Sequence, residues 1–140
     1  MAELDNSPKR EAIDLENPQF YVNRELSLIE FQRRVLDEAN DPSVPLLERV
    51  RFLSIFGSNM DEFFMIRLAG LKQQVAAGVR DSGPDGMTPA EQLAAVRRVA
   101  NEILHEARRV WRDRLVPALA SEGIRVLDYD QLPIEAKLEL

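Results

Sequence analysis

One segment of the sequence decides the fold, Arg49-Val-Arg-Phe-Leu-Ser-Ile-Phe-Gly-Ser-Asn-Met-Asp-Glu-Phe-Phe-Met-Ile-Arg67. Apolar residues recur at helical spacing on both sides of a polar break, Gly57-Ser58-Asn59. Glycine commonly ends a helix, and Asn59 with Glu62 three positions later has the form of an N-cap and its acidic partner. The segment therefore predicts two helices that meet at a corner, with Asn59 at the start of the second.

The corner has two interpretations. A cap side chain is structural, because it satisfies the free backbone N–H groups where a helix begins. The same N–H groups also favour anions and polar ligand atoms, so Asn59 could contact a ligand there. Local chemistry favours the structural interpretation, since caps are far more common than ligand sites.

The rest of the chain predicts an all-α fold, an irregular antiparallel bundle of four main helices. The helices are expected at Ser27–Asn40, Pro45–Phe56, Met60–Ala77 and Pro89–Ser121. Short connections make neighbouring helices antiparallel. The expected core consists mainly of Phe31, Leu53, Phe56, Phe64, Leu68, Ile103, Val110 and Trp111.

Local signals mark the helix ends. Ser27 and Glu30 have the spacing of a capping box, and Thr88-Pro-Ala-Glu91 is a clear helix start. Pro117 is expected to bend or loosen the last turns of the fourth helix, and Gly123 is expected to end it.

The sequence predicts three parts. Residues 1–19 have few large apolar side chains and are expected to form a flexible tail. Residues 20–122 should form the helical domain. Residues 123–140 contain a short extended run, Ile124–Leu127, and a helix start at Leu132, so they are expected to begin a following, truncated domain and to be loosely held after Tyr129.

Composition is typical of a single soluble domain, with 140 residues of which 45% are hydrophobic. No apolar run approaches the roughly 20 residues of a membrane span, and we expect a cytoplasmic protein. The lack of cysteine excludes disulfides and thiolate metal sites. The net charge of −6 argues against a general polyanion binder, and we expect no nucleic-acid partner.

The residues do not predict a complete active site. Glycine-rich phosphate loops are missing from the sequence, and Asp61 and Glu62 would point about 100° apart on a helix. His105 is the only histidine and makes a poor metal site. Phosphoryl transfer needs a metal, a nucleophile and several cations held together. We therefore expect no catalytic or metal-binding residues, and a binding or assembly module.

Arginines form a stripe on the expected fourth helix, within about 120° of one another. The stripe consists of Arg97, Arg98, Arg108, Arg109 and Arg112. It could face a polyanionic ligand or a neighbouring domain. The favoured interpretation is a solvated helix face that Glu102 and Glu106 partly neutralise, because exposed helix faces are usually charged.

Two runs carry a resemblance to a known family. Tyr21-Val-Asn-Arg-Glu-Leu-Ser-Leu-Ile-Glu-Phe31 and Pro45-Leu-Leu-Glu-Arg-Val-Arg-Phe-Leu-Ser-Ile-Phe-Gly-Ser-Asn-Met-Asp-Glu-Phe-Phe-Met-Ile-Arg67 resemble the amino-terminal domain of the bacterial polyphosphate kinases. The resemblance extends from about Phe20 to the region of Leu132. It implies an enzyme that reversibly transfers the terminal phosphate of ATP to polyphosphate through a phosphohistidine, with magnesium bound in other domains.

The resemblance also implies a role for single residues. It makes the chain a nucleotide-capping domain in which Asn59 contacts the base, and an Asn amide can both donate to and accept from a purine. His105 does not match the phosphorylated histidine of the family. Possible supporting or interdomain residues are Ser58, Arg51, Arg67, Arg97, Arg108 and Arg112.

The implied partners are the head and catalytic domains of the same enzyme, ATP or ADP, and polyphosphate. Alone, the chain is expected to be inactive and to bind ATP weakly or not at all. The alternative is a free-standing helical interaction module that does not bind nucleotide.

Overall fold

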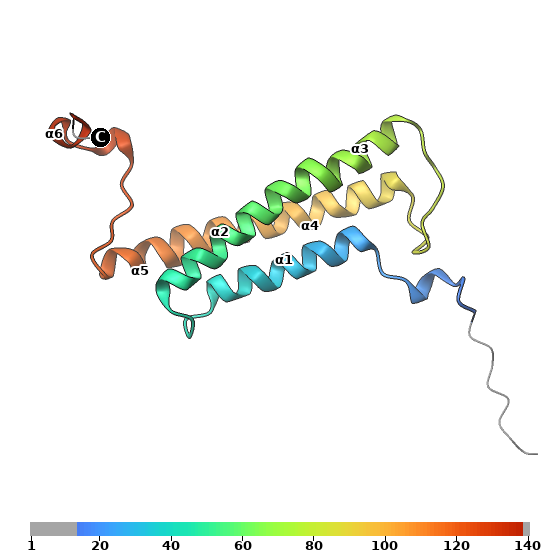
Figure 1. The fold of residues 1–140 in the computed structure, drawn as a ribbon, viewed down its shortest axis with the longest axis horizontal. Coiled ribbons are helices and arrows are strands. Elements are labelled where there is room, and N and C mark those ends of the chain that lie inside the picture. The colour runs from blue at the N-terminus through green and yellow to red at the C-terminus, as the bar shows by residue number, and fades with distance from the viewer. Residues whose placement is uncertain (1–13, 139–140) are drawn as a thin grey trace, which may run out of the picture.

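Three long helical rods lie side by side in the structure, a computed structural model that describes residues 14–138 (Figure 1). The first rod is α1 (Arg24–Asn40). The second joins α2 (Leu46–Glu62), the π-helical turn η2 (Phe63–Leu68) and α3 (Ala69–Ala76). The third joins α4 (Pro89–Arg109), the π-helical turn η3 (Val110–Leu115) and α5 (Val116–Ser121). The described residues form no strand, and the all-α prediction is confirmed.

The predicted corner at Gly57 is wrong. Gly57, Ser58 and Asn59 lie inside α2, which continues without interruption through η2 into α3, so the second and third predicted helices are one rod. A single Gly costs a helix interior only about 1 kcal/mol, and the buried side chains of Phe56 and Met60 pack beside the break. Packing therefore overrides the local signal for a turn.

The first helix starts earlier than predicted. Asn23 is its N-cap, and the Asn23 side chain accepts hydrogen bonds from the backbone N–H groups of Glu25 and Leu26, each at 3.0 Å. Ser27 lies one turn inside α1 and is exposed. The predicted capping box at Ser27 is therefore wrong, because Asn23 supplies the cap one turn earlier.

The third rod begins and ends where the sequence predicts. Thr88 and Glu91 form the predicted capping box at the start of α4. Gly123 follows the end of α5 with φ of +81°, the left-handed conformation that glycine adopts most easily. The π turn η3 ends at Leu115, two residues before Pro117, which has no N–H to donate to the preceding turn.

The core lies between the three rods. Its fully buried large side chains are Ile29, Leu36, Met60, Val96, Ile103 and Leu115. Of the predicted core, Phe56, Leu68, Ile103 and Val110 are buried, and Leu53, Phe64 and Trp111 pack partly buried against it.

Phe31 is the error in the predicted core, since its side chain is 50% exposed. The buried positions of α1 are Ile29, Gln32, Leu36 and Ala39. Phe31 precedes Gln32 by one residue, which turns it about 100° away from that seam.

Short elements flank the rods. A 3-10 turn, η1 (Pro18–Phe20), precedes α1, and the chain beyond α5 passes through an exposed extended segment to η4 (Tyr129–Gln131) and α6 (Ile134–Leu138). Figure 1 shows α6 away from the three rods. Residues 124–128 have no regular secondary structure, and a helix follows Leu132 as predicted. Most of the predicted flexible tail, residues 1–13, lies outside the described residues.

None of the helices in residues 14–138 combines the length and the apolar character needed to cross a membrane.

Candidate functional site

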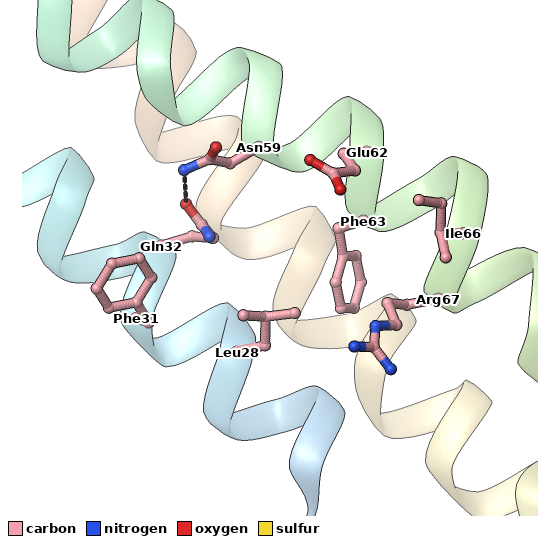
Figure 2. A pocket seen from close by; sticks show the side chains of 8 residues that line it. All are labelled: Leu28, Phe31, Gln32, Asn59, Glu62, Phe63, Ile66 and Arg67. Carbon is pink, nitrogen blue, oxygen red and sulfur yellow. Dashed lines mark hydrogen bonds between the residues drawn. The ribbon is translucent and has the colours of Figure 1, made fainter.

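A groove of about 340 Å³ lies between the first and second rods. Three of its side chains come from α1 and five from α2 and η2 (Figure 2). The lining residues are Leu28, Phe31, Gln32, Asn59, Glu62, Phe63, Ile66 and Arg67. The groove thus contains Asn59 and Arg67, two of the residues that the sequence singled out.

Asn59 faces α1 across the groove. Its Nδ2 donates a hydrogen bond of 2.9 Å to Oε1 of Gln32, as Figure 2 shows. Gln32 is 5% exposed and occupies a position on the buried seam of α1. Asn59 is therefore a helix-interior residue with a tertiary partner, and its predicted role as an N-cap is wrong.

Half of the side chains that line the groove are apolar. Phe63 is 2% exposed and belongs to the core, whereas Phe31 and Ile66 are 50% and 60% exposed. The groove therefore combines a buried aromatic side chain, two exposed apolar side chains and one amide pair. Pockets for small molecules commonly combine apolar walls with a few polar groups in this way.

Arg67 brings a positive charge to the groove. Its guanidinium lies 3.8 Å from Oε1 of Glu25, whose side chain is 14% exposed. The other carboxylate oxygen of Glu25 is buried without a hydrogen-bond partner among the described residues. The ion pair ties η2 to the first turn of α1.

The π turn places Arg67 on the same side as Asn59. In a regular α-helix, residues eight positions apart point about 80° away from each other. A π turn takes an extra residue, i to i+5, and rotates the following residues back. Arg67 lies in η2, and both residues line the groove. No pattern in the sequence indicates this turn, which depends on packing.

The other arginines that the sequence singled out lie outside the groove lining. Arg51 is exposed on α2, 3.7 Å from Glu48. Arg97 and Arg108 are exposed on α4. Arg112 is exposed on η3, where its Nε lies 2.7 Å from Asp113. This contact holds the pKa of the Asp113 carboxyl below its ordinary value and raises the pKa of Arg112.

Two further polar residues, Ser58 and His105, also lie outside the groove lining. Ser58 is exposed on α2 beside Asn59 but does not line the groove. His105 is exposed on α4. Among residues 14–138, no three His, Asp or Glu side chains gather as metal ligands would.

Gln32 is the site residue that sequence reasoning missed. A signal for it exists, because Ile29, Gln32 and Leu36 follow the three-and-four spacing of a buried helix face and Gln32 is the polar member. Buried polar side chains need partners, so a glutamine on an apolar seam marks a position where another helix supplies one.

Comparison with known proteins places the chain in a family. A sequence profile described as the polyphosphate kinase N-terminal domain matches residues 21–127. The polyphosphate kinase of Thermosynechococcus vestitus is 52% identical over 137 residues, which are 96% of this chain and 19% of that protein. The polyphosphate kinase of Prosthecochloris aestuarii is 51% identical over 117 residues, 83% of this chain and 16% of that protein.

The chain thus spans less than a fifth of the length of these relatives. No solved structure matched significantly. The profile match covers most of the bundle, including the Gln32 and Asn59 pair. On this evidence the chain belongs to the polyphosphate kinase N-terminal domain family.

Proposed function

We propose that this domain covers the nucleotide in a polyphosphate kinase, and that its groove contacts the base of ATP. The observation that carries the proposal is the amide of Asn59, which lines an open groove with one hydrogen-bond partner, Gln32, among the described residues. An amide offers an acceptor and two donor hydrogens, so most of its capacity is left for a ligand.

The walls of the groove suit a flat aromatic ligand. Phe31 and Ile66 expose apolar surface on either side of the amide, and a base would remove that surface from water. Aromatic side chains also stack on bases. Arg67, about one-third exposed, adds a cation that can attract a phosphate.

The remaining chemistry belongs to other domains in this proposal. Phosphoryl transfer to polyphosphate requires a nucleophile and magnesium, and we assign both to the head and catalytic domains of the complete enzyme. Exposed Met65 and Ile66, at 71% and 60%, provide apolar surface that those domains can cover. Ser58, Arg51, Arg97, Arg108 and Arg112 are proposed as supporting or interdomain contacts. We expect the enzyme to act in the cytoplasm.

The test uses a chimera in which this chain replaces the matching residues of the Thermosynechococcus vestitus polyphosphate kinase. Asn59→Ala should raise the KM for ATP by up to about tenfold, the factor that 1.4 kcal/mol represents. The same change should cost the fold about 1–3 kcal/mol, because it leaves the oxygen of the buried Gln32 without its donor.

Asn101→Ala is the matched control, since Asn101 is exposed on α4 and does not line the groove. Its KM for ATP should equal that of the unmutated chimera. A KM that Asn59→Ala leaves unchanged, with the chimera folded and active, would refute the base contact.

A further inference from the structure

Gln32 contributes to the groove through its contact with Asn59. Its side chain is 5% exposed, which leaves little surface for a ligand, and its Oε1 accepts from Asn59 Nδ2 at 2.9 Å. Leu28 and Phe31 of the same helix also line the groove. Gln32 is thus held inside α1 by packing, while Asn59 is the partner that reaches the groove from α2.

In the structure this hydrogen bond runs from Asn59 to Gln32, so it sets the direction of the Asn59 amide as long as Gln32 presents its oxygen. An Asn amide can rotate by half a turn, which exchanges its oxygen and nitrogen. Because Nδ2 of Asn59 is bound to Gln32, the other terminal atom of the amide, Oδ1, points elsewhere. Figure 2 shows Oδ1 turned away from Gln32. Among the described residues, Oδ1 of Asn59 has no donor and is not one of the buried unsatisfied atoms.

The fixed amide has a preference among purines. Its free edge offers the Oδ1 acceptor and the second hydrogen of Nδ2. Adenine presents an amino donor next to a ring-nitrogen acceptor, and Asn pairs with that edge through both atoms. Guanine has a carbonyl oxygen in place of the amino group, so Oδ1 would face another acceptor. The reversed amide would instead suit the Watson–Crick edge of guanine, where the carbonyl oxygen lies next to a ring N–H donor.

We propose that Gln32 is a positioning residue that holds the Asn59 amide in the orientation that selects a 6-amino purine over a 6-oxo purine. The inference rests on the proposed base contact of Asn59. Gln32 itself acts through Asn59. Its loss should therefore change the choice of nucleotide more than the rate of catalysis.

The test compares ATP with GTP in the chimera described above, using the ratio of kcat/KM for the two nucleotides. Where GTP is turned over too slowly, its inhibition constant against ATP replaces its KM. Gln32→Met removes the acceptor while keeping a side chain of similar length. It should lower the preference for ATP by about three- to tenfold, mainly through KM.

Two further variants show whether Gln32 acts through Asn59. Gln32→Glu keeps an oxygen that accepts from Nδ2 and should keep the preference within about twofold. In a chain that already carries Asn59→Ala, adding Gln32→Met should not change the preference for ATP any further, because the Asn59 amide that Gln32 positions is gone. Gln74→Met, at an exposed position of α3, is the control for substitution of a glutamine by methionine.

The outcomes separate the two proposals. If Asn59→Ala lowers ATP preference and Gln32→Met does not, the base contact stands and the positioning role is refuted. If Gln32→Met lowers the preference equally in the presence and absence of Asn59, Gln32 does not act through Asn59. If Asn59→Ala has no effect on either nucleotide, both proposals fail. Circular dichroism of the isolated variants checks that each chain remains helical.

Discussion

Asn23 joins two parts of the fold through one side chain. Its oxygen caps α1, and its Nδ2 donates to Asp85 in the loop before α4 at 2.7 Å. Asn23→Ala should lower the free energy of unfolding by about 2 kcal/mol, because it removes a cap and a hydrogen bond to a carboxylate. Urea denaturation measures the loss. Ser27→Ala should stay within about 0.5 kcal/mol of the original chain, as Ser27 is an exposed helix residue; equal losses would contradict the cap assignment.

Glu91 makes stability depend on pH. Hydrogen bonds from the backbone and side chain of Thr88 hold the pKa of the Glu91 carboxyl below its ordinary value of 4.5. A carboxyl with a lowered pKa in the folded state stabilises the fold above its unfolded pKa and loses that effect as pH falls through the folded pKa. Glu91→Gln keeps the geometry of the capping box without the charge.

The difference in free energy of unfolding between the original chain and the Glu91→Gln variant should therefore be constant above about pH 4.5. It should shrink below that pH. Thermal unfolding from pH 7 to pH 3 measures this. A difference that does not change with pH would show that the charge of Glu91 has no part in the cap.

At the scale of the elements, Gly57 tests the unbroken second rod. A Cβ added at Gly57 would meet no atom within 4 Å, and the residue lies in α2. Gly57→Ala should therefore raise the free energy of unfolding by about 0.5–1 kcal/mol, since Ala favours helix. Gly78→Ala should lower it, because Gly78 has φ of +72°. A loss of stability in the Gly57→Ala variant would indicate that the second rod bends at Gly57, as the sequence predicts.

The elements also show what sequence can predict. Helical periodicity located all three rods, and the Thr88 and Glu91 cap was readable because its partners are three positions apart. The pair of Asn59 and Gln32 joins residues 27 positions apart, so it depends on how two helices pack. The same holds for Gly57, where packing of neighbouring side chains outweighs a modest local preference. Asn59 was found by resemblance, and its surroundings required the structure.

At the scale of the whole molecule, the bundle and the segment that follows it should differ in resistance to protease. Residues 122–130 are exposed, and they include Arg125. Arg97 and Arg98 are also exposed but lie within α4, where the backbone is held in a helix. Brief trypsin digestion should therefore cleave after Arg125 before it cleaves within α4. Mass spectrometry identifies the fragments, and early cleavage at Arg97 would contradict a stable bundle.

The isolated chain should also be unable to make polyphosphate. The proposed groove contacts a base through one amide, worth about 0.5–1.5 kcal/mol. Such a contact predicts a dissociation constant for ATP no better than about millimolar. Titration calorimetry measures the affinity, and incubation with ATP and magnesium tests synthesis. Polyphosphate formed by the purified 140 residues would place catalysis within this domain.

The continuous helix through Gly57 has a mechanical consequence. From Leu46 to Ala76 the second rod extends about 45 Å at roughly 1.5 Å per residue. A bend at Gly57 would have let the part of the rod that carries Asn59 and Arg67 move relative to the part before Gly57. The continuous helix instead keeps these two parts in a fixed arrangement. In the proposed function, a movement that covers the nucleotide would then carry the bundle as a rigid body. Residues 124–128, which are exposed and have no regular secondary structure, are where such a body would pivot.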